Sequence, residues 1–284
     1  MRNKLSFLVT VGGLATIAVS ALALTLTGTG EVRYSADHTD TIPFWHRWVP
    51  ALVGIALVRL VPPRTSRRAV TEPAGTVRGE ALVLAATAVL FAVGLWLAGG
   101  GEPAHTALKL PLLLAVPLVV FRVTRRRGGA APIGVPDVTG AWRRWGPTVP
   151  VAAWLVLAHA SPVAVPTRGA VGGDDALTLV LTVVIVFAVN SLLEEVFYRR
   201  WLQTRWEVLL GAWPGIVVAS LLWAVWHVGI QGSGALPADL ASAVVNQGVQ
   251  GLFLGYLWSR YRTLWPILTV HGAMNVAPTL LALL

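Results

Sequence analysis

The sequence contains no cysteine, which excludes disulfide bonds, thiolate metal ligands and a cysteine nucleophile. Charged residues are also scarce, because Asp, Glu, Lys and Arg together make up 12% of the 284 residues, whereas soluble domains have about 25%. The sequence has no internal repeat or low-complexity tract, so an internal duplication of the kind found in transporters is unsupported.

Apolar residues dominate instead, at 55% of the chain, and the mean hydropathy is +0.68. This composition predicts an all-α, polytopic transmembrane helical bundle. The formal net charge is +9, but the arginines gather in short connections between apolar runs. The positive-inside rule explains that distribution without a nucleic-acid partner. Many of the 13 tryptophans lie near the ends of apolar runs, as interfacial belts do.

The apolar runs predict about nine membrane spans. They are the run up to residue 26, then 49–61, 81–98, 107–123, 149–165, 177 to beyond 200, 213–230, 240–258 and 266–284. The first run could be a signal peptide, since Ala21-Leu22-Ala23 resembles a cleavage site, which would leave eight spans. We favour a retained helix because the run is long enough to span.

Loop charges predict the orientation of these spans. The basic connections within 62–78, 122–144 and 260–262 all fall on one side when the spans alternate, and the acidic loops at 31–40 and 174–175 fall on the other. The positive-inside rule then places the N-terminus inside and the C-terminus outside. The richness in Ala, Val and Arg suggests a bacterial cytoplasmic membrane.

An acidic pair, Glu194-Glu195, follows the apolar run 182–193 directly. Ionised carboxylates at bilayer depth are costly, so such a pair is a functional-site hypothesis. On a helix Glu195 faces Arg199 four residues later, and that ion pair would leave Glu194 free for chemistry. Alternatively, the acidic pair ends a helix and balances Arg199 and Arg200 at the membrane surface.

Two later apolar helices also carry polar residues deep in their length. One has His227, four residues after Trp223, and the last has His271 and Asn275 one turn apart on one face. A single membrane histidine is more often a packed, hydrogen-bonded residue, but the three segments together point to a site. His159, Asn246, Gln247 and Gln250 are better explained as interhelical hydrogen bonds than as cavity lining. The remaining histidines, His38, His46 and His105, are interpreted as loop residues without a role.

Taken in order, Glu-Glu-x-x-x-Arg, aromatic-x-x-x-His and His-x-x-x-Asn on successive helices resemble one family. It is the type II CAAX prenyl endopeptidase and bacteriocin-processing family, whose bacterial members are often labelled Abi or CPBP intramembrane proteases. Trp223 stands where that family most often has phenylalanine. The resemblance covers residues 177–284, as a catalytic core, while residues 1–176 form N-terminal transmembrane helices that resemble nothing specific.

The resemblance implies an intramembrane endopeptidase that acts on a membrane-associated peptide or protein. By motif position, Glu194 would be the general base and His227 would help to hold the attacking water. His271 and Asn275 would donate hydrogen bonds to the oxyanion, and the pair of Glu195 and Arg199 would orient the site. No cofactor is expected, and the sequence predicts no oligomeric state.

Zinc is the alternative within this interpretation, with Glu194, His227 and His271 as ligands, because two histidines and a carboxylate suit a catalytic zinc. The sequence has no His-Glu-x-x-His spacing, and we favour the metal-free mechanism. From other classes, the same residues could form the proton relay of a proton-coupled transporter or channel. The chain could also be a noncatalytic immunity or scaffold member of the family.

The expected depth of the site leaves one question open. Glu194 and His271 lie a turn or two from the basic side of the predicted bundle, but His227 lies about 21 Å past Trp213 at 1.5 Å per residue. Either the helix after Trp213 starts inside the bilayer, or the helix that contains Glu194 extends well past Arg200. A deep, water-filled cavity would also reconcile them.

Overall fold

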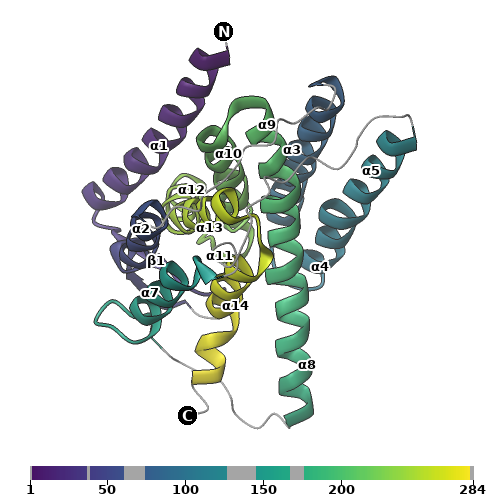
Figure 1. Ribbon diagram of the computed structural model, residues 1–284. Coiled ribbons are helices and arrows are strands. Elements are labelled where there is room, and N and C mark those ends of the chain that lie inside the picture. Colours follow the sequence, from purple (N-terminus) through teal and green to yellow (C-terminus); the bar gives the residue numbers. More distant parts are fainter. Residues whose placement is uncertain (1, 37–38, 61–73, 127–144, 167–175, 282–284) are drawn as a thin grey trace.

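The computed structural model describes residues 2–36, 39–60, 74–126, 145–166 and 176–281. The predicted all-α polytopic bundle is confirmed, with one small addition that the sequence analysis missed. Strands β1 (Glu31–Arg33) and β2 (Thr41–Pro43) pair antiparallel, with Val32 opposite Ile42. This hairpin lies in the predicted outside loop, directly before helix α2 (Figure 1).

The first half of the described chain contains α1 (Arg2–Leu26), α2 (Phe44–Leu60), α3 (Ala74–Leu97), α4 (Ala104–Lys109), the π-helical η1 (Leu110–Ala115), α5 (Val116–Arg126) and α7 (Thr148–His159). The second half contains α8 (Ala176–Val186), η2 (Phe187–Leu192), η3 (Glu195–Gln203), α9 (Thr204–Leu210), α10 (Ala212–Val225), α11 (Val228–Gln231), α12 (Leu236–Ala243), η4 (Val244–Gly248), α13 (Val249–Tyr261) and α14 (Leu264–Leu281).

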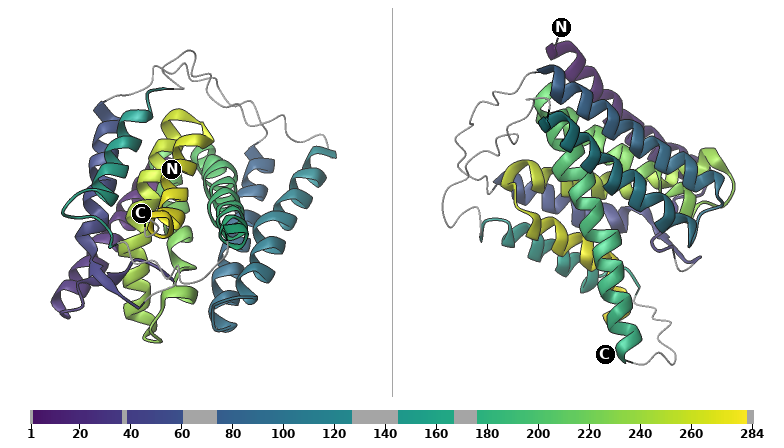
Figure 2. Two further views of the ribbon diagram at one scale, coloured as in Figure 1. Left: turned by 90° about the horizontal axis from the view of Figure 1, so that it is seen from below. Right: turned by 90° about the vertical axis from the view of Figure 1, so that its right-hand side faces the viewer.

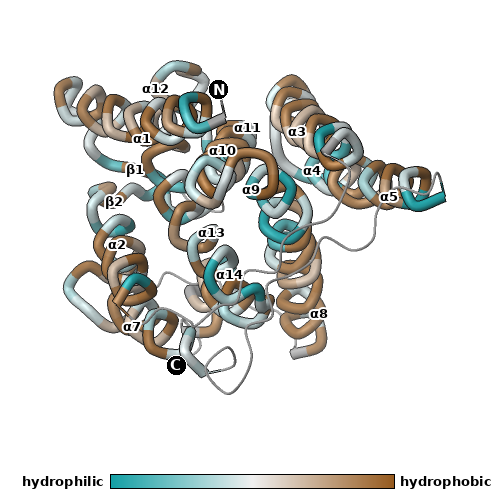
Figure 3. The backbone as a smooth tube through the Cα atoms, turned by 45° about the horizontal axis from the view of Figure 1, so that its top comes forward, coloured by the Kyte–Doolittle hydropathy of each residue, from teal (hydrophilic) through white to brown (hydrophobic). Residues whose placement is uncertain are grey.

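Five helices within the described residues are long and apolar enough to cross a membrane. They are Asn3–Leu26, Gly75–Leu97, Ala104–Arg126, Leu177–Leu210 and Ala212–Gln231. Figure 3 shows hydrophobic stretches along α1, α3 and α8 and hydrophilic ones at the start of α1 and the end of α5. The predicted total of about nine spans stays a prediction.

One continuous helix of 34 residues, Leu177–Leu210, takes in most of α8 together with η2, η3 and α9 and crosses the bundle (Figure 2). It ends at Gly211, whose φ of +103° suits glycine, and α10 then returns alongside α9. Glu194 therefore lies 16 residues before the end of α9 and His227 lies 15 residues after the start of α10, depths of about 24 and 22 Å at 1.5 Å per residue. The extension of this helix beyond Arg200 answers the question of depth.

Helix α13 lies at the centre of the core. All of its residues from Val249 to Trp258 are buried, and it packs against α10 on one side and α2 on another. A Cβ added at Gly251 would lie 2.9 Å from the Cβ of Ser220, so glycine allows α13 to approach α10 this closely. Among the N-terminal helices, α1 packs against α10, α2 against α13 and α3 against α9, while α8 and α14 lie at the front of the view in Figure 1.

One contact marks each end of helix α10 in the bundle. Ser6 near the N-terminus donates a hydrogen bond to the Leu210 carbonyl, and at the other end of α10 the loop at Gly100 lies against Gly229. Much of the charge used for the predicted orientation lies outside the described residues, so N-terminus-inside stays a prediction. The charged loop residues outside the described ranges are Asp37, Arg64, Arg67, Arg68, Arg127, Arg143, Arg144, Asp174 and Asp175. His38 and Trp142, also named from the sequence, lie outside these ranges too.

Candidate active site

Glu194 lies between two π-helical segments, η2 and η3, of the long helix. Extra residues in such turns change the directions in which the flanking side chains point, and they occur frequently at functional sites. The Glu194 side chain is buried, and both its oxygens accept hydrogen bonds. Lys109 Nζ lies 2.5 Å from Oε1 and Trp223 Nε1 lies 2.6 Å from Oε2. The carboxylate is therefore fixed at two points.

The expectation that Glu194 stays unpaired is wrong, because Lys109 forms a buried ion pair with it. The neighbouring pair was expected, and Arg199 Nε lies 3.6 Å from Glu195 Oε2. The guanidinium also stacks over the Trp223 ring, 4.7 Å from its centroid. Each of the two adjacent carboxylates thus has a cation of its own, since an unpaired charge in an apolar interior is costly.

His271 on α14 lies between the two carboxylates. Its Nδ1 is 2.7 Å from Glu195 Oε1, and its Nε2 is 3.8 Å from Glu194 Oε2. The imidazole also meets the Trp223 ring edge-to-face, with 5.4 Å between ring centroids. The structure therefore brings the first and third motifs into direct contact.

His227 lies just beyond the end of α10, one turn from Trp223. Its Nδ1 is 2.9 Å from the Trp223 carbonyl oxygen, which can only accept, so Nδ1 carries the proton. In the neutral ring Nε2 is then the acceptor. The ring also packs against Trp226, with 3.9 Å between centroids. His227 shares Trp223 with Glu194, and its fixed tautomer offers a lone pair to a water molecule.

Asn275 lies one turn after His271 on α14. Its Nδ2 donates a hydrogen bond of 3.0 Å to Ser191 Oγ on η2, one turn before Glu195. An amide nitrogen has two N–H groups, so one remains for a ligand. All six residues singled out from the sequence therefore lie on η2–η3, α10 and α14 or directly beside them.

Lys109 and its neighbours were missed by the sequence analysis. Lys109 Nζ contacts Glu194, Asn190 Oδ1 at 2.9 Å and His105 Nε2 at 3.2 Å. His105, interpreted from the sequence as a loop residue without a role, is on α4 and is 3.0 Å from Glu102 Oε1 through Nδ1. A signal was present, because a lysine inside the apolar run 107–123 is as unusual in a membrane helix as a carboxylate.

The other polar residues of the buried helices form interhelical hydrogen bonds, as predicted for Asn246, Gln247 and Gln250. Arg47 Nε donates to Asn246 Oδ1 at 3.1 Å, and Gln250 Nε2 donates to the Arg47 carbonyl at 2.6 Å. Gln247 Nε2 donates to Gln231 Oε1 at 2.6 Å. His159 instead packs edge-to-face on Trp154, and neither ring nitrogen has a hydrogen-bond partner among the described residues.

The arrangement does not fit a zinc ion. Across the part of the chain that the structure describes, no group of three or more His, Cys, Asp or Glu side chains is placed to hold a metal. One oxygen of Glu194 faces the Lys109 ammonium and the other faces the Trp223 N–H. The Lys109 ammonium on one prospective ligand oxygen repels a second cation there.

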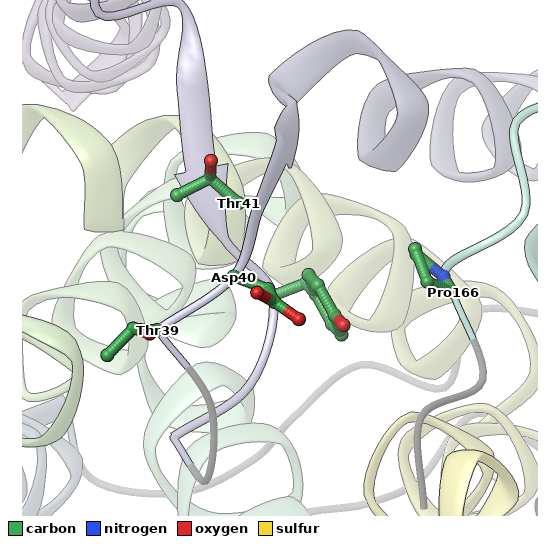
Figure 4. Close-up of a pocket in the computed structure, with 5 residues that line it drawn as sticks. Thr39, Asp40, Thr41 and Pro166 are labelled. Carbon is green, nitrogen blue, oxygen red and sulfur yellow. The ribbon is translucent and has the colours of Figure 1, made fainter.

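A polar pocket of about 340 Å³ lies beside the β-hairpin, apart from these residues (Figure 4). It is lined by Tyr34, Thr39, Asp40, Thr41 and Pro166. None of the six residues lines it, so this pocket is not part of the candidate active site.

Residues 176–277 match the family model described as type II CAAX prenyl endopeptidase Rce1-like. The matched segment includes all six candidate residues, and the resemblance inferred from the motifs is confirmed over this part of the chain. A match to a protease family, together with the apolar helices, supports an integral membrane protein with an intramembrane protease type of function. No curated protein and no solved structure matches the sequence.

Proposed function

We propose that this chain, which resembles the type II CAAX prenyl endopeptidases over residues 176–277, hydrolyses a peptide bond in a membrane-associated substrate. The observation that carries the proposal is the placement of Glu194. It is held at both oxygens in the bundle interior, with His271 at 3.8 Å and with Trp223 linking it to His227. Three motifs that are short and separate in sequence thereby converge on one carboxylate.

In the proposed reaction Glu194 is the general base and His227 holds the attacking water. Glu194 takes a proton from water as the water oxygen bonds to the scissile carbonyl carbon. The C–N bond then breaks, and the proton passes from Glu194 to the leaving amine nitrogen. The acceptor nitrogen of His227, Nε2, fits the second hydrogen of the water.

The developing oxyanion is assigned to His271 and Asn275. Asn275 offers its second amide N–H, and preorganised donors of this kind stabilise the tetrahedral intermediate. His271 already uses Nδ1 towards Glu195, so donation from Nε2 as well requires a ring with both protons. In this assignment, the ion pair of Glu195 and Arg199 orients His271.

Asn275→Ala is expected to lower kcat by about 10²–10³-fold with a small change in KM, since it removes one oxyanion donor. Ser191→Ala is the matched control, because it removes only the partner of Asn275 in the resting site. Steady-state cleavage of a membrane-anchored peptide measures both. Equal losses in the two variants would mean that the hydrogen bond between Asn275 and Ser191 matters for folding and not for the oxyanion.

We also propose a metal-free mechanism, because the donor set around Glu194 does not fit zinc. Purified protein in liposomes is expected to cleave a library of membrane-anchored peptides at an unchanged rate after dialysis against a strong chelator. Loss of cleavage on chelation, with recovery on adding zinc, would contradict this and make Glu194, His227 and His271 ligands.

Residues 1–176 are proposed to enclose the catalytic core at residues 177–284. Contacts of α1 with α10, α2 with α13 and α3 with α9 support this arrangement of the two segments. We place the protein in a bacterial cytoplasmic membrane with its N-terminus inside. A lipid bilayer and a membrane-associated peptide are its proposed partners, and nothing in the described site suits a nucleic acid.

A proton-coupled transporter is the second candidate, favoured by one observation. Contacts run from Glu102, whose side chain is 61% exposed, through His105 and Lys109 to Glu194 and on through His271 to Glu195. However, Arg199 meets Glu195 only through the 3.6 Å ion pair, and no guanidinium nitrogen of Arg199 has a hydrogen-bond partner among the described residues, so no hydrogen bond continues the chain beyond Glu195. Proton flux into liposomes without peptide cleavage would favour this candidate. A noncatalytic immunity or scaffold role predicts neither activity.

A further inference from the structure

Lys109 is fully buried and comes from the part of the chain that precedes the family match at residues 176–277. It is the last residue of α4, directly before η1, and a π-helical segment there changes the direction of the flanking side chains. Its ammonium reaches across to the long helix, where it meets Asn190 on η2 and Glu194. Helix α4 thus contributes a charge to a site otherwise built by residues 191–275.

Every donor of the Lys109 ammonium is used. A lysine ammonium has three N–H groups, and Nζ has three acceptors at hydrogen-bond distance: Glu194 Oε1, Asn190 Oδ1 and His105 Nε2. The Nζ atom also lies 5.0 Å from the centroid of the Trp226 ring, the ring that packs on His227. A side chain fixed from three directions can fix the group it binds.

A second layer of contacts fixes His105. Because His105 Nε2 accepts from Lys109, its proton is on Nδ1, which is 3.0 Å from Glu102 Oε1. Glu102 also accepts hydrogen bonds from the backbone N–H and the hydroxyl of Thr106. The tautomer of His105 is therefore set by a carboxylate at the surface end of α4.

The charges around Glu194 explain why this carboxylate needs a cation such as Lys109 to stay ionised. Lys109 is the nearest cation, since His271 Nε2 lies 3.8 Å away, beyond hydrogen-bond distance, and Arg199 is paired with Glu195. A carboxylate in an apolar interior without a partner loses its charge in preference to remaining ionised. A general base has to be ionised and correctly oriented before water arrives.

We propose that Lys109 is a positioning residue for the catalytic base, which holds Glu194 ionised with one oxygen fixed, and that His105 and Glu102 hold Lys109 in place. This inference rests on the proposed function, because it assigns a role within the same site. It extends the site from three motifs to a fourth helix, α4, that the family match does not include.

Lys109→Met is expected to lower kcat about 100-fold with little change in KM, the loss that accompanies displacement of a catalytic group by about 1 Å. Arg205→Met is the matched control. It breaks the ion pair between half-buried Arg205 and buried Glu80, in which Nε and Oε2 are 2.6 Å apart and which lies on α9 and α3 away from the site. Loss of kcat in both variants to the same extent would overturn the proposal, because any broken ion pair would then suffice.

Rescue separates charge from volume. In Lys109→Ala, n-propylammonium replaces the missing atoms with their charge, and 1-propanol replaces nearly the same volume without it. Cleavage is expected to recover with n-propylammonium only. Equal recovery with both compounds, or with neither while the variant remains folded by circular dichroism, would overturn the proposal.

An infrared measurement tests the inference without any substrate. The difference spectrum between the wild type and Glu194→Gln is expected to contain an ionised carboxylate band, and the same difference recorded in a Lys109→Met background is expected to contain a neutral carboxyl band. An ionised band in both backgrounds would overturn the inference even if the protein cleaves nothing. A protein without cleavage but with the expected bands would overturn only the proposed function.

Discussion

Glu194→Gln is expected to lower kcat by about 10²–10⁴-fold, the contribution of a positioned general base. Glutamine keeps the size of the side chain and an oxygen acceptor for Trp223 Nε1, but its NH2 group then faces the Lys109 ammonium, so the folded fraction of the variant is measured together with its rate. It removes the charge that takes the proton from water. The measurement is single-turnover cleavage of a membrane-anchored peptide by enzyme in liposomes, which isolates the chemical step from product release.

The control for this prediction is Glu207→Gln. Glu207 is also a carboxylate on the long helix, half-buried, and it pairs with Arg262. Its loss is expected to leave the cleavage rate unchanged once the folded fraction is taken into account. If Glu194→Gln cleaves at the wild-type rate, Glu194 is not the base, and the role assigned to it is wrong.

Arg199→Met is expected to destabilise the protein by about 3–5 kcal/mol, because it leaves Glu195 as a buried carboxylate without its cation. Arg199 and Glu195 are both fully buried, and the guanidinium also covers the Trp223 ring. Denaturation of the purified protein in detergent micelles, followed by tryptophan fluorescence, measures the change in the free energy of unfolding.

The double variant Glu195→Gln/Arg199→Met separates the ion pair from packing. Removing both charges is expected to restore much of the lost stability, because neither side chain of the double variant is then a buried charge without a counterion. A double variant as unstable as the sum of the two single variants would show that Glu195 and Arg199 contribute independently. The pair would then have no orienting role.

The part of the site that could be predicted from the sequence is the part where polar residues interrupt apolar helices. Glu194, His227 and His271 are conspicuous against such a background, because burial without a partner is costly and therefore implies a partner. The four-residue spacings place Glu195 beside Arg199, and Asn275 on the same face as His271. The structure brings these groups together, at distances that include 2.7 Å between His271 and Glu195.

The pairing of Glu194 with Lys109 could not be derived from spacing. The two residues are 85 positions apart, and only the tertiary fold, which brings the Lys109 side chain to the long helix, makes them neighbours. Lys109 itself was visible, but its role depends on which helix it faces. The π-helical turns of η2 and η3 could not be predicted from the sequence either, since the energy difference between a π-helical and an α-helical turn is small and depends on packing. These turns decide where Ser191 and Glu194 point.

The extension of the helix past Arg200 has a physical cause that the apolar pattern alone does not show. Beyond Arg200 the chain stays helical through α9, where Arg205 pairs with Glu80 and Glu207 pairs with Arg262. Polar side chains that find partners on α3 and at the end of α13 allow a helix to continue beyond its apolar part. Gly211 then ends it, and the return of α10 brings His227 to the depth of Glu194.

The most direct test of the central claim is cleavage in water enriched in the heavy oxygen isotope. Wild-type protein in liposomes, given a library of membrane-anchored peptides, is expected to release fragments whose new C-terminal carboxylate carries one heavy oxygen atom by mass spectrometry. Those fragments should fall to background with Glu194→Gln. Fragments formed equally by the variant, or proton flux through the liposomes with no fragments from the wild type, would contradict the account.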